Sequence, residues 1–451
     1  MSFFELLKES NDTNARISTI NLQRRSVILP IFMPVATHGV LKASHFRVKD
    51  VVLGNTFHLR DLNKDLKDYM GIDACLTDSG GFQIISLKNT INEDGVLFLD
   101  YSSDGKLQKE EFSVPEQQEE DIADENFSNF CRNVYCFDCY CEGCPFEEMM
   151  REKYLKKYEN RVKKIDELYN MYILTPEKSI SIQNKLNSDI AMQLDDVIRP
   201  ESNKRRHLMA VKRSIRWLDR LLHAHKNKTQ NIFPIVQGGL HEDLRNFSVE
   251  EILKRTKHEN VNGIAIGGLC GGESKKLFCE IVFKTSKILR SKFNGPIYVM
   301  GVGYPEDVII SICLGSDMSD CVYPTRTARF GRIFTDYGDI NLNSYKKEKN
   351  TNLNIKINDG KSLNDCKCRT CKNFTLEYLV EIRKTENFCI LTTEHNLFYM
   401  QNLTDKIKLA IQNDNLLEFL KEWTDKRFGK EKPDWILHVF ELLSIKQLNT
   451  T

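Results

Sequence analysis

Charge imbalance and long apolar runs are both missing from this 451-residue sequence. Lys and Arg together number 64 against 63 Asp and Glu, which gives a formal net charge of +1. So little net charge excludes nucleic-acid binding through overall positive charge, and any such ligand has to be held by a local basic face. No stretch approaches the roughly 18 apolar residues of a membrane-spanning helix, and the start, MSFFELLKESND, turns acidic too early for a secretory signal. We therefore expect a soluble, cytoplasmic protein with no membrane span.

Cysteine, by contrast, is plentiful. The chain has 14 cysteines and no visible export signal, so bound metal or free thiols are expected in place of disulfides. Two clusters have CxxC or CxC spacing: Cys136, Cys139, Cys141 and Cys144 in one, and Cys366, Cys368 and Cys371 in the other. The remaining cysteines that we expect as small residues in or near the core are Cys75, Cys270, Cys279, Cys313, Cys321 and Cys389.

The apolar pattern predicts an α/β fold. Short β-branched runs end in Gly, Asp or another turn residue, and most are followed by a stretch with helical periodicity. Eight runs predict strands at residues 26–35, 51–55, 74–78, 189–195, 232–237, 263–267, 297–301 and 320–323. The clearest helix candidates are residues 204–225, 242–258, 274–291 and 305–314. Repeated alternation of this kind is typical of a (β/α)8 TIM-type barrel.

One break in the regular spacing predicts an insertion between the third and fourth strands. Residues 107–173 are first acidic, then rich in Cys, and then helical with many Lys and Glu. After Gly331 the barrel pattern ends, and a stretch rich in Asn and Lys leads into the later cysteines. We predict a barrel formed by residues 1–106 and 174–338, an inserted Cys-rich module at 107–173, and a small subdomain with C-terminal helices at 339–451.

Polar residues stand where the predicted strands end. They are Asp78, Asp195, Gln237, Gly268, Gly301 and Asp320. The carboxyl ends of the strands carry the chemistry in barrels of this type, so these residues are candidates for a site. Any single one of them also has a simpler interpretation as a strand-terminating turn residue.

Six motifs stand out along the chain: LTDSGGFQ (76–83), MQLDDV (192–197), FPIVQGGL (233–240), AIGGLCGGES (265–274), VMGVGYPED (299–307) and DCVYPTRTARFG (320–331). They resemble the motifs of tRNA-guanine transglycosylases of the eukaryotic type and occur in the same order as in that family. Shorter matches at PIFMPV, LGNTFHL and RSIRWLDR extend the resemblance over nearly all of the chain except the insertion and the C-terminal tail. The resemblance implies exchange of guanine 34 for queuine in tRNAs with a GUN anticodon, those for Asp, Asn, His and Tyr.

The resemblance also assigns the catalytic residues. Asp320 matches the family nucleophile that attacks C1′ of guanosine 34, and Asp78 matches the acid/base that serves the leaving and entering bases. Exchange with retained configuration requires a covalent intermediate and two carboxyl groups, as retaining glycosidases illustrate. A plain strand-end cap is the alternative interpretation of Asp320.

The same motifs contain the residues that we expect to recognise the base. Asp195 offers an acceptor and Gln237 a mixed donor and acceptor, which suits the edge of a purine-like base. By resemblance Phe82 stacks over the ring, although simple core packing is its alternative interpretation. Gly271 leaves room for the cyclopentenediol of queuine, although it also suits a turn, and Gly271 with Val197 resembles the eukaryotic, queuine-using members of the family. The full substrate-binding set is Asp78, Ser79, Gly80, Gly81, Phe82, Asp195, Gln237, Gly268 and Met300.

RNA contacts are expected from two segments. Arg326 and Arg329 match residues that read the uridines on either side of guanosine 34, because guanidinium groups suit phosphates and base edges. The basic residues of segment 204–216 are interpreted as a solvated helix face, with RNA contacts as the alternative; they are Lys204, Arg205, Arg206, Lys212, Arg213 and Arg216. The predicted RNA-binding residues are Gly301, Val302, Gly303, Tyr304, Pro305, Glu306, Asp307, Thr325, Arg326, Thr327, Ala328 and Arg329.

The later cysteines match the structural zinc site of the family. Cys366, Cys368, Cys371 and His395 form a Cys3His set that leaves no position open for water. The C-terminal subdomain is therefore expected to bind one structural Zn²⁺. Cysteines between Cys131 and Cys144 have no counterpart in the family pattern, and a second Zn²⁺ or a redox-sensitive loop are equal alternatives for them.

The sequence departs from the family pattern at two places, and three other interpretations of the chain are to be weighed. The segment after LGNTFHL is shorter than usual, and Ser319 stands where the family usually has Phe, which removes a packing group beside Asp320. The alternatives are a non-catalytic partner subunit, an archaeal-type enzyme acting on the D-arm, and a zinc-ribbon RNA-binding protein on a barrel scaffold. The presence of both Asp78 and Asp320 argues against the first, and the short chain after His395 against the second. The active form is expected to be a dimer, with a non-catalytic paralogue as the partner.

Overall fold

The chain forms two compact units, Met1–Leu87 with Thr175–Thr451 and Lys88–Leu174. The computed structural model describes residues 2–81, 89–91, 93, 95–98, 172–200, 202–344 and 366–448. In the second unit the described residues form an antiparallel sheet of β7 (Asn89–Ile91), β8 (Val96–Phe98) and β9 (Tyr172–Leu174), with β8 in the middle. Most of the predicted insertion, including Cys131 to Cys144, lies outside the described residues.

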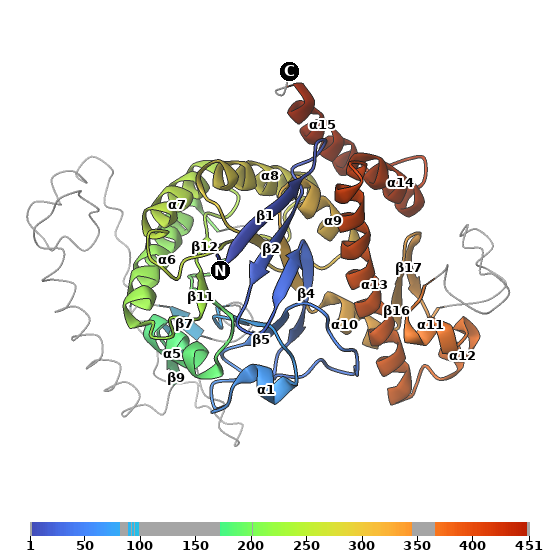
Figure 1. Ribbon diagram of the computed structural model, residues 1–451, viewed down its shortest axis with the longest axis horizontal. Coiled ribbons are helices and arrows are strands. Elements are labelled where there is room, and N and C mark those ends of the chain that lie inside the picture. The colour runs from blue at the N-terminus through green and yellow to red at the C-terminus, as the bar shows by residue number, and fades with distance from the viewer. Residues whose placement is uncertain are drawn as a thin grey trace, which may run out of the picture. The chain divides into compact units, whose positions relative to one another are not determined.

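The first unit is built around a closed parallel sheet, which confirms the predicted (β/α)8 barrel (Figure 1). The sheet order is β11-β10-β6-β5-β4-β15-β14-β13-β12, and β11 and β12 are two pieces of one run on either side of Pro234. The ring therefore closes through a single interrupted strand. The strands are β4 (Ile31–Ala36), β5 (Val52–Asn55), β6 (Cys75–Asp78), β10 (Ile190–Met192), β11 (Asn231–Phe233), β12 (Ile235–Val236), β13 (Ile264–Ile266), β14 (Ile297–Val299) and β15 (Met318–Cys321).

A hydrogen bond to the Gln193 side chain bridges the interruption of the strand at Pro234. Proline has no backbone N–H and cannot donate to a neighbouring strand. The Gln193 side-chain oxygen accepts from the Ile235 N–H at 2.9 Å, while the Pro234 carbonyl accepts from Ala265 on the other side at 2.8 Å. Hydrogen bonding therefore continues across the break, and the ring stays closed.

Two predicted strands differ from the structure. The run 26–35 is divided at a cis peptide bond between Leu29 and Pro30, and its first half is the antiparallel strand β3 (Ser26–Leu29). The last barrel strand begins at Met318, earlier than predicted, and Tyr323 already opens helix α10 (Tyr323–Arg329). Polar Asp317 and Ser319 flank the single apolar residue Met318, so no apolar run marked this strand.

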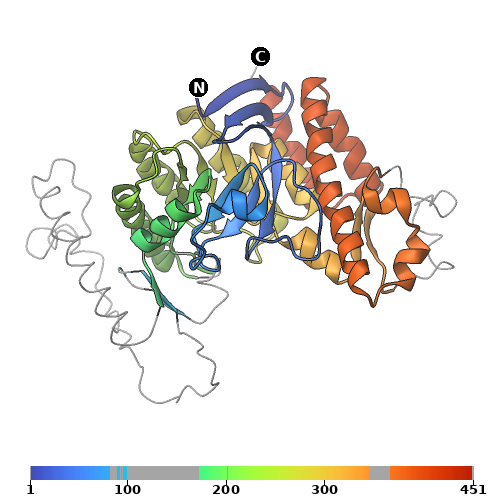
Figure 2. The same cartoon turned by 60° about the horizontal axis from the view of Figure 1, so that its bottom comes forward.

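A small antiparallel sheet, not predicted from the sequence, covers the amino-terminal end of the barrel. It consists of β1 (Phe4–Glu9), β2 (Arg16–Asn21) and β3 (Figure 2). Phe4, Ile20 and Leu29 join Met33 and Tyr298 in the core cluster inside the ring. This sheet therefore closes one end of the barrel and leaves the opposite end, where the strands finish, for a site.

Helices connect most of the barrel strands as predicted. The structure has α1 (Leu66–Met70), α5 (Pro176–Leu186), α6 (Lys204–Ala224), α7 (Glu242–Arg255), α8 (Lys275–Lys292) and α9 (Pro305–Leu314). Asn203 and Ser274 begin α6 and α8 by accepting a hydrogen bond from a backbone N–H of the first turn. No helix occupies residues 37–51, all of which are described, so the alternation fails between β4 and β5. Helix α13 (Glu386–Gln412), which comes later in the chain, packs against β4 instead.

The C-terminal part combines a hairpin with helices. It contains β16 (Arg332–Thr335), β17 (Gly338–Asn341), α11 (Arg369–Asn373), α12 (Leu376–Glu381), α14 (Leu416–Phe428) and α15 (Asp434–Leu448). Ile333 and Ile340 of the hairpin form one buried cluster with residues of α11, α12 and α13, whereas α14 and α15 join the core around α8 and α9. Among the described residues, none of the helices has the length and apolar character to cross a membrane.

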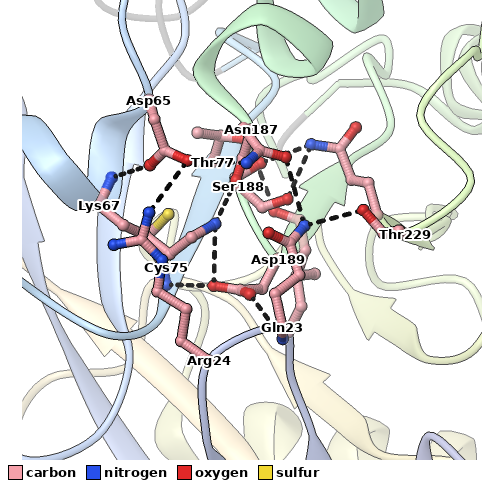
Figure 3. Close-up of polar contacts among 12 residues, drawn as sticks. Gln23, Arg24, Asp65, Lys67, Cys75, Thr77, Asn187, Ser188, Asp189 and Thr229 are labelled. Carbon is pink, nitrogen blue, oxygen red and sulfur yellow. Dashed lines mark hydrogen bonds and ion pairs between the residues drawn. The ribbon is translucent and has the colours of Figure 1, made fainter.

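A buried polar network ties the amino ends of β6 and β10 together (Figure 3). The Lys67 side chain is fully buried; its ammonium donates to the Asn187 carbonyl and lies 3.6 Å from an Asp189 carboxylate oxygen. Asp189 also accepts from the backbone N–H groups of Cys75 at 2.9 Å and Gln23 at 3.1 Å. The buried charges are thus paired, as burial requires.

We expect the buried pair of Arg16 and Asp317 to be a main contributor to stability. Arg16 donates twice to Asp317, at 2.9 and 2.7 Å. Burial alone would raise the pKa of Asp317, but Arg16, Arg290 and the Ile297 N–H together outweigh it, so the pKa lies below its ordinary value. Asp317→Asn should lower the free energy of unfolding at pH 7 by about 3 to 5 kcal/mol, since it leaves a buried guanidinium unpaired.

Urea unfolding at several pH values tests this prediction. A lowered folded-state pKa contributes stability above the ordinary pKa of Asp and loses it as pH falls through the folded value. The variant should therefore lose less stability than the wild type on acidification. Asp414→Asn, in an exposed pair with Lys8, is the matched control and should change stability by less than about 1 kcal/mol. Equal effects of the two substitutions would contradict the prediction.

Candidate active site

Three carboxyl groups and one amide meet at the carboxyl end of the barrel. Asp78 is the last residue of β6 and Asp320 lies near the end of β15, while Asp195 and Gln237 follow β10 and β12. Asp78, Asp195 and Gln237 are buried, and Asp320 is partly exposed. Residues predicted from distant motifs are therefore brought to one place by the parallel strand order.

Asp320 is held through one of its two carboxylate oxygens. Oδ1 accepts from the Tyr298 hydroxyl at 2.5 Å and from the Gly301 N–H at 2.9 Å. Within the described residues Oδ2 makes no hydrogen bond, so it is the oxygen available to react. Burial raises the pKa of Asp320, whereas the two donors oppose this rise because they stabilise the charged form.

Asp78 lies close enough to Asp320 for their charges to interact. Its Oδ2 accepts from the Asn55 amide at 3.2 Å, and Asn55 is its register partner on β5. Burial, reinforced by the negative charge of Asp320, raises the pKa of Asp78 to about 7. A carboxyl group with this pKa can both give and take a proton near neutral pH, as an acid/base must.

Asp195 and Gln237 form a rigid pair beside these two. The Gln237 amide donates to Asp195 at 2.5 Å, and burial raises the pKa of Asp195 to about 7. Glycines line the pair because nothing larger fits. A Cβ on Gly268, which has φ +66°, would lie 2.5 Å from the Gln237 oxygen, and one on Gly81 would lie 2.9 Å from Asp195.

The other members of the predicted substrate-binding set fall around this pair. Ser79 is buried and its hydroxyl accepts from the Gly81 N–H at 3.1 Å, and Gly80 has a φ of +91°. Met300 follows β14 and its sulfur would lie 3.6 Å from a Cβ on Gly267. Phe82 lies outside the described residues.

Three supporting residues escaped the sequence analysis. Tyr298 and Asn55 hold the two catalytic candidates. Tyr298 lies inside a predicted strand and Asn55 inside the LGNTFHL match, but the sequence analysis assigned neither a role. Arg245 of α7 is 2% exposed and donates to the carbonyls of Gly239 at 2.7 Å and Gly267 at 3.0 Å. It fixes the loops after β12 and β13, but an Arg on a helix reads as a solvated residue in sequence.

Gly271 packs against Pro200, because a Cβ on it would lie 2.5 Å from the Pro200 ring. The structure thus gives this glycine a packing role in addition to the predicted room for a larger base. The neighbouring Cys270, which we expected in or near the core, is exposed. Ser319 is buried, pairs with Phe32 of β4, and takes no part in the hydrogen bonds that hold Asp320.

The two predicted RNA-binding segments expose only part of their residues. Gly301, Tyr304 and Arg326 are exposed, and Glu306 and Arg329 are half-buried. The buried members, whose side chains shape the segments, are Val302, Gly303, Pro305, Asp307, Thr325, Thr327 and Ala328. Among the acidic members, Asp307 is paired with Lys275 and Glu306 with Arg427.

The basic face of α6 is partly neutralised. Arg206 and Arg213 both form ion pairs with the buried Asp196, at 2.8 and 2.5 Å. Lys204 pairs with Asp243 at 2.7 Å. These pairs favour the interpretation of segment 204–216 as a structural and solvated helix face.

Cys366, Cys368, Cys371 and His395 form a cluster that could hold a metal ion, with ligand atoms within 4.8 Å of one another. The His395 Nδ1 lies 3.8, 3.5 and 3.3 Å from the three sulfurs in turn. A tetrahedron around zinc, with bonds of about 2.0 to 2.3 Å, has edges of about 3.5 to 3.8 Å. The His395 Nε2–H donates to the Phe334 carbonyl at 2.8 Å, which leaves Nδ1 free to bind a metal.

Comparison with known proteins agrees with this geometry. The sequence profile of the family described as queuine tRNA-ribosyltransferase matches residues 11–120 and 146–429, and the unmatched stretch between them contains Cys131 to Cys144. The queuine tRNA-ribosyltransferase catalytic subunit of Schizosaccharomyces pombe is 34% identical, over 99% of this chain and 98% of its own. The Caenorhabditis elegans catalytic subunit is 33% identical, over 96% of each chain. The queuine tRNA-ribosyltransferase of Bacillus subtilis is 32% identical, over 96% of this chain and 97% of its own. The chain therefore belongs to the queuine tRNA-ribosyltransferase family.

Proposed function

We propose that this chain is a tRNA-guanine transglycosylase, which replaces guanine 34 by queuine in tRNAs with a GUN anticodon. The observation that supports this most directly is the meeting of Asp78 and Asp320 at the open end of the barrel. A chain of this family that retains both carboxyl groups is not suited to be a non-catalytic subunit.

Asp320 acts as the nucleophile. Its Oδ2 forms a bond to C1′ of guanosine 34, the bond from C1′ to the base breaks, and the electron pair leaves with guanine. Tyr298 and Gly301 hold Oδ1, so that Oδ2 faces the ribose in one orientation. The product of this step is a covalent link between the chain and the RNA.

Asp78 moves the proton in both halves of the exchange. Its protonated carboxyl gives a proton to the leaving guanine, and the resulting carboxylate takes one from the incoming queuine. Queuine then attacks C1′ and releases Asp320. A pKa of about 7 suits a group that has to act in both directions.

The base is held by Asp195, Gln237 and the backbone of Gly268. Gln237 keeps its amide on Asp195, which leaves its carbonyl oxygen and the second Asp195 oxygen for the edge of the base. Gly271 and Val197 support queuine as the incoming base. Phe82 as a stacking residue, Met300 as a lining residue, and the domain boundaries given above remain predictions.

The cysteine cluster is proposed to hold one structural Zn²⁺. Three thiolates and one imidazole nitrogen are the donor set that zinc prefers in closed sites, and the ion supplies a cross-link with no part in the exchange. A second ion between Cys131 and Cys144 is not part of this proposal. The proposed partners are the substrate tRNA and a second, non-catalytic subunit, and the relatives named as catalytic subunits support the latter.

Replacement of the nucleophile should abolish exchange. Asp320→Asn should lower incorporation of labelled guanine into tRNA by roughly 10⁴-fold or more, since a nucleophile cannot be replaced by its neighbours. The wild type should also form an RNA adduct that survives a denaturing gel, and the variant should not. Asp243→Asn, on the exposed face of α7, is the matched control and should exchange normally. A stable adduct in Asp320→Asn would exclude the proposed mechanism.

The pH dependence should report both carboxyl groups. The ionised Asp320 is lost as pH falls and the protonated Asp78 is lost as pH rises through about 7, so the rate of adduct formation should be bell-shaped. Tyr298→Phe removes a donor that lowers the pKa of Asp320, so its acidic limb should move to higher pH. Its kcat should fall by roughly 10²-fold with an unchanged KM for guanine. An unchanged acidic limb would show that Tyr298 does not act on Asp320.

Metal content and stability test the zinc site. His395→Ala should bind less than one Zn²⁺ per chain by elemental analysis and unfold at a lower temperature than the wild type. The wild type should bind one ion through these four residues. His223→Ala, at an exposed position on α6, is the control and should keep both the metal and the melting temperature. Full metal content in His395→Ala would exclude this ligand set.

A further inference from the structure

Phe330 is the most exposed large hydrophobic side chain of the described part of the chain, with 70% of its surface accessible. Single exposed apolar residues are common and need no explanation by themselves. Phe330 differs from the others through its position, its backbone and its charged neighbours.

The backbone that carries Phe330 is fixed on both sides. Its N–H donates to the Thr327 carbonyl at 3.1 Å, and its own carbonyl accepts from the Asn343 amide at 3.0 Å. Gly331 follows with a φ of +82°, and a Cβ there would lie 2.7 Å from the Asn343 amide nitrogen. The ring therefore projects from a rigid support, which lowers the entropy lost when a ligand binds.

Two exposed arginines flank the ring. Arg326 lies four residues before Phe330, on the same side of α10, and Arg332 lies two residues after it. Within the described residues neither guanidinium has an ion pair or a hydrogen bond, unlike that of Arg427, which pairs with Glu306 and Asp339. An exposed aromatic ring between two unpaired positive charges is complementary to a single-stranded nucleic acid, whose bases stack while its phosphates are neutralised.

The position of Phe330 relative to Asp320 agrees with binding of a single-stranded nucleic acid. Helix α10 begins three residues after Asp320 and runs for 7 residues, a length of about 10 Å. About three stacked nucleotides span the same distance, at roughly 3.4 Å each. The ring therefore lies within reach of bases next to the nucleotide that reacts at Asp320.

We propose that Phe330 is a stacking platform for an unpaired base of the tRNA anticodon loop, beside the exchanged guanosine, with Arg326 and Arg332 on the neighbouring phosphates. This inference rests on the proposed function and adds a binding residue to it. Every base has a face that can stack, so the contact supplies affinity and orientation without sequence preference.

A mutant cycle on protein and RNA tests the proposal. The RNA is an anticodon stem-loop with the target guanosine, in which each other loop nucleotide is replaced in turn by an abasic one. Phe330→Ala should raise the KM for intact RNA by roughly tenfold or more, while the KM for guanine stays unchanged. Phe330→Trp should restore the wild-type KM. Ile28→Ala, an exposed apolar position on β3 at the opposite end of the barrel, is the control and should have no effect.

The decisive result is non-additivity at one loop position. There, the abasic RNA should bind the wild type as weakly as intact RNA binds Phe330→Ala, and combining both changes should weaken binding no further. Additive effects at every position, with normal exchange by the wild type, would overturn the stacking proposal and leave the function intact. A shift of Phe330→Ala from dimer to monomer with unchanged RNA affinity would also overturn it, in favour of a second subunit on this face. Absence of exchange by the wild type would count against the proposed function instead.

Discussion

Closure of the parallel sheet is the constraint on which the site depends. Asp78, Asp195, Gln237 and Asp320 come from four strands, and only a closed ring brings β6, β10, β12 and β15 to one opening. The ring closes across Pro234, which has no N–H to donate, and the N–H of the next residue, Ile235, donates to the Gln193 side-chain oxygen. A side chain two positions before Asp195 thus helps to hold the strand that ends at Gln237. The motif MQLDDV therefore contributes both to closing the barrel, through Gln193, and to the candidate site, through Asp195.

The ionisation of the carboxyl groups at this opening depends on the hydrogen-bond donors and charges that surround each of them. Burial raises the pKa of all three carboxyl groups. Backbone N–H groups oppose this rise at both Asp78 and Asp320, but the charge of Asp320 raises the pKa of Asp78 further, whereas the Tyr298 hydroxyl lowers that of Asp320. The expected outcome is an ionised Asp320 beside a protonated Asp78 near neutral pH. An ionised nucleophile beside a protonated acid is what the exchange needs, and the surroundings of each carboxyl group produce these two states.

The sequence predicted the parts that repeat or that belong to a motif. Strand and helix alternation predicted the barrel, and α9 was placed at its observed bounds because proline begins it and glycine follows it. β1 and β2 were missed because neither has an apolar run: β1 (FELLKE) buries only its first residue, and β2 (RISTIN), although largely buried, mixes polar and apolar residues. The absent helix between β4 and β5 was missed too, since nothing local reveals that a distant helix covers β4. Tyr298, Asn55 and Arg245 act through partners far away in the chain, which no local pattern contains.

The metal cluster has its effect through helix α13. His395 lies within this helix, and the next residue, Asn396, donates to the carbonyls of Pro324 at 3.1 Å and Arg332 at 3.0 Å and accepts from the Phe334 N–H at 3.0 Å. One turn earlier, Thr392 donates to the Ala328 carbonyl. These bonds hold α10 and β16, the segments that carry Arg326, Arg329 and Phe330. The same helix packs on β4, next to the strand of Asp320. A metal ion held by His395 would therefore also help to fix α10 and β16, next to which the proposed RNA-binding residues lie, because the helix that carries His395 is hydrogen-bonded to both segments.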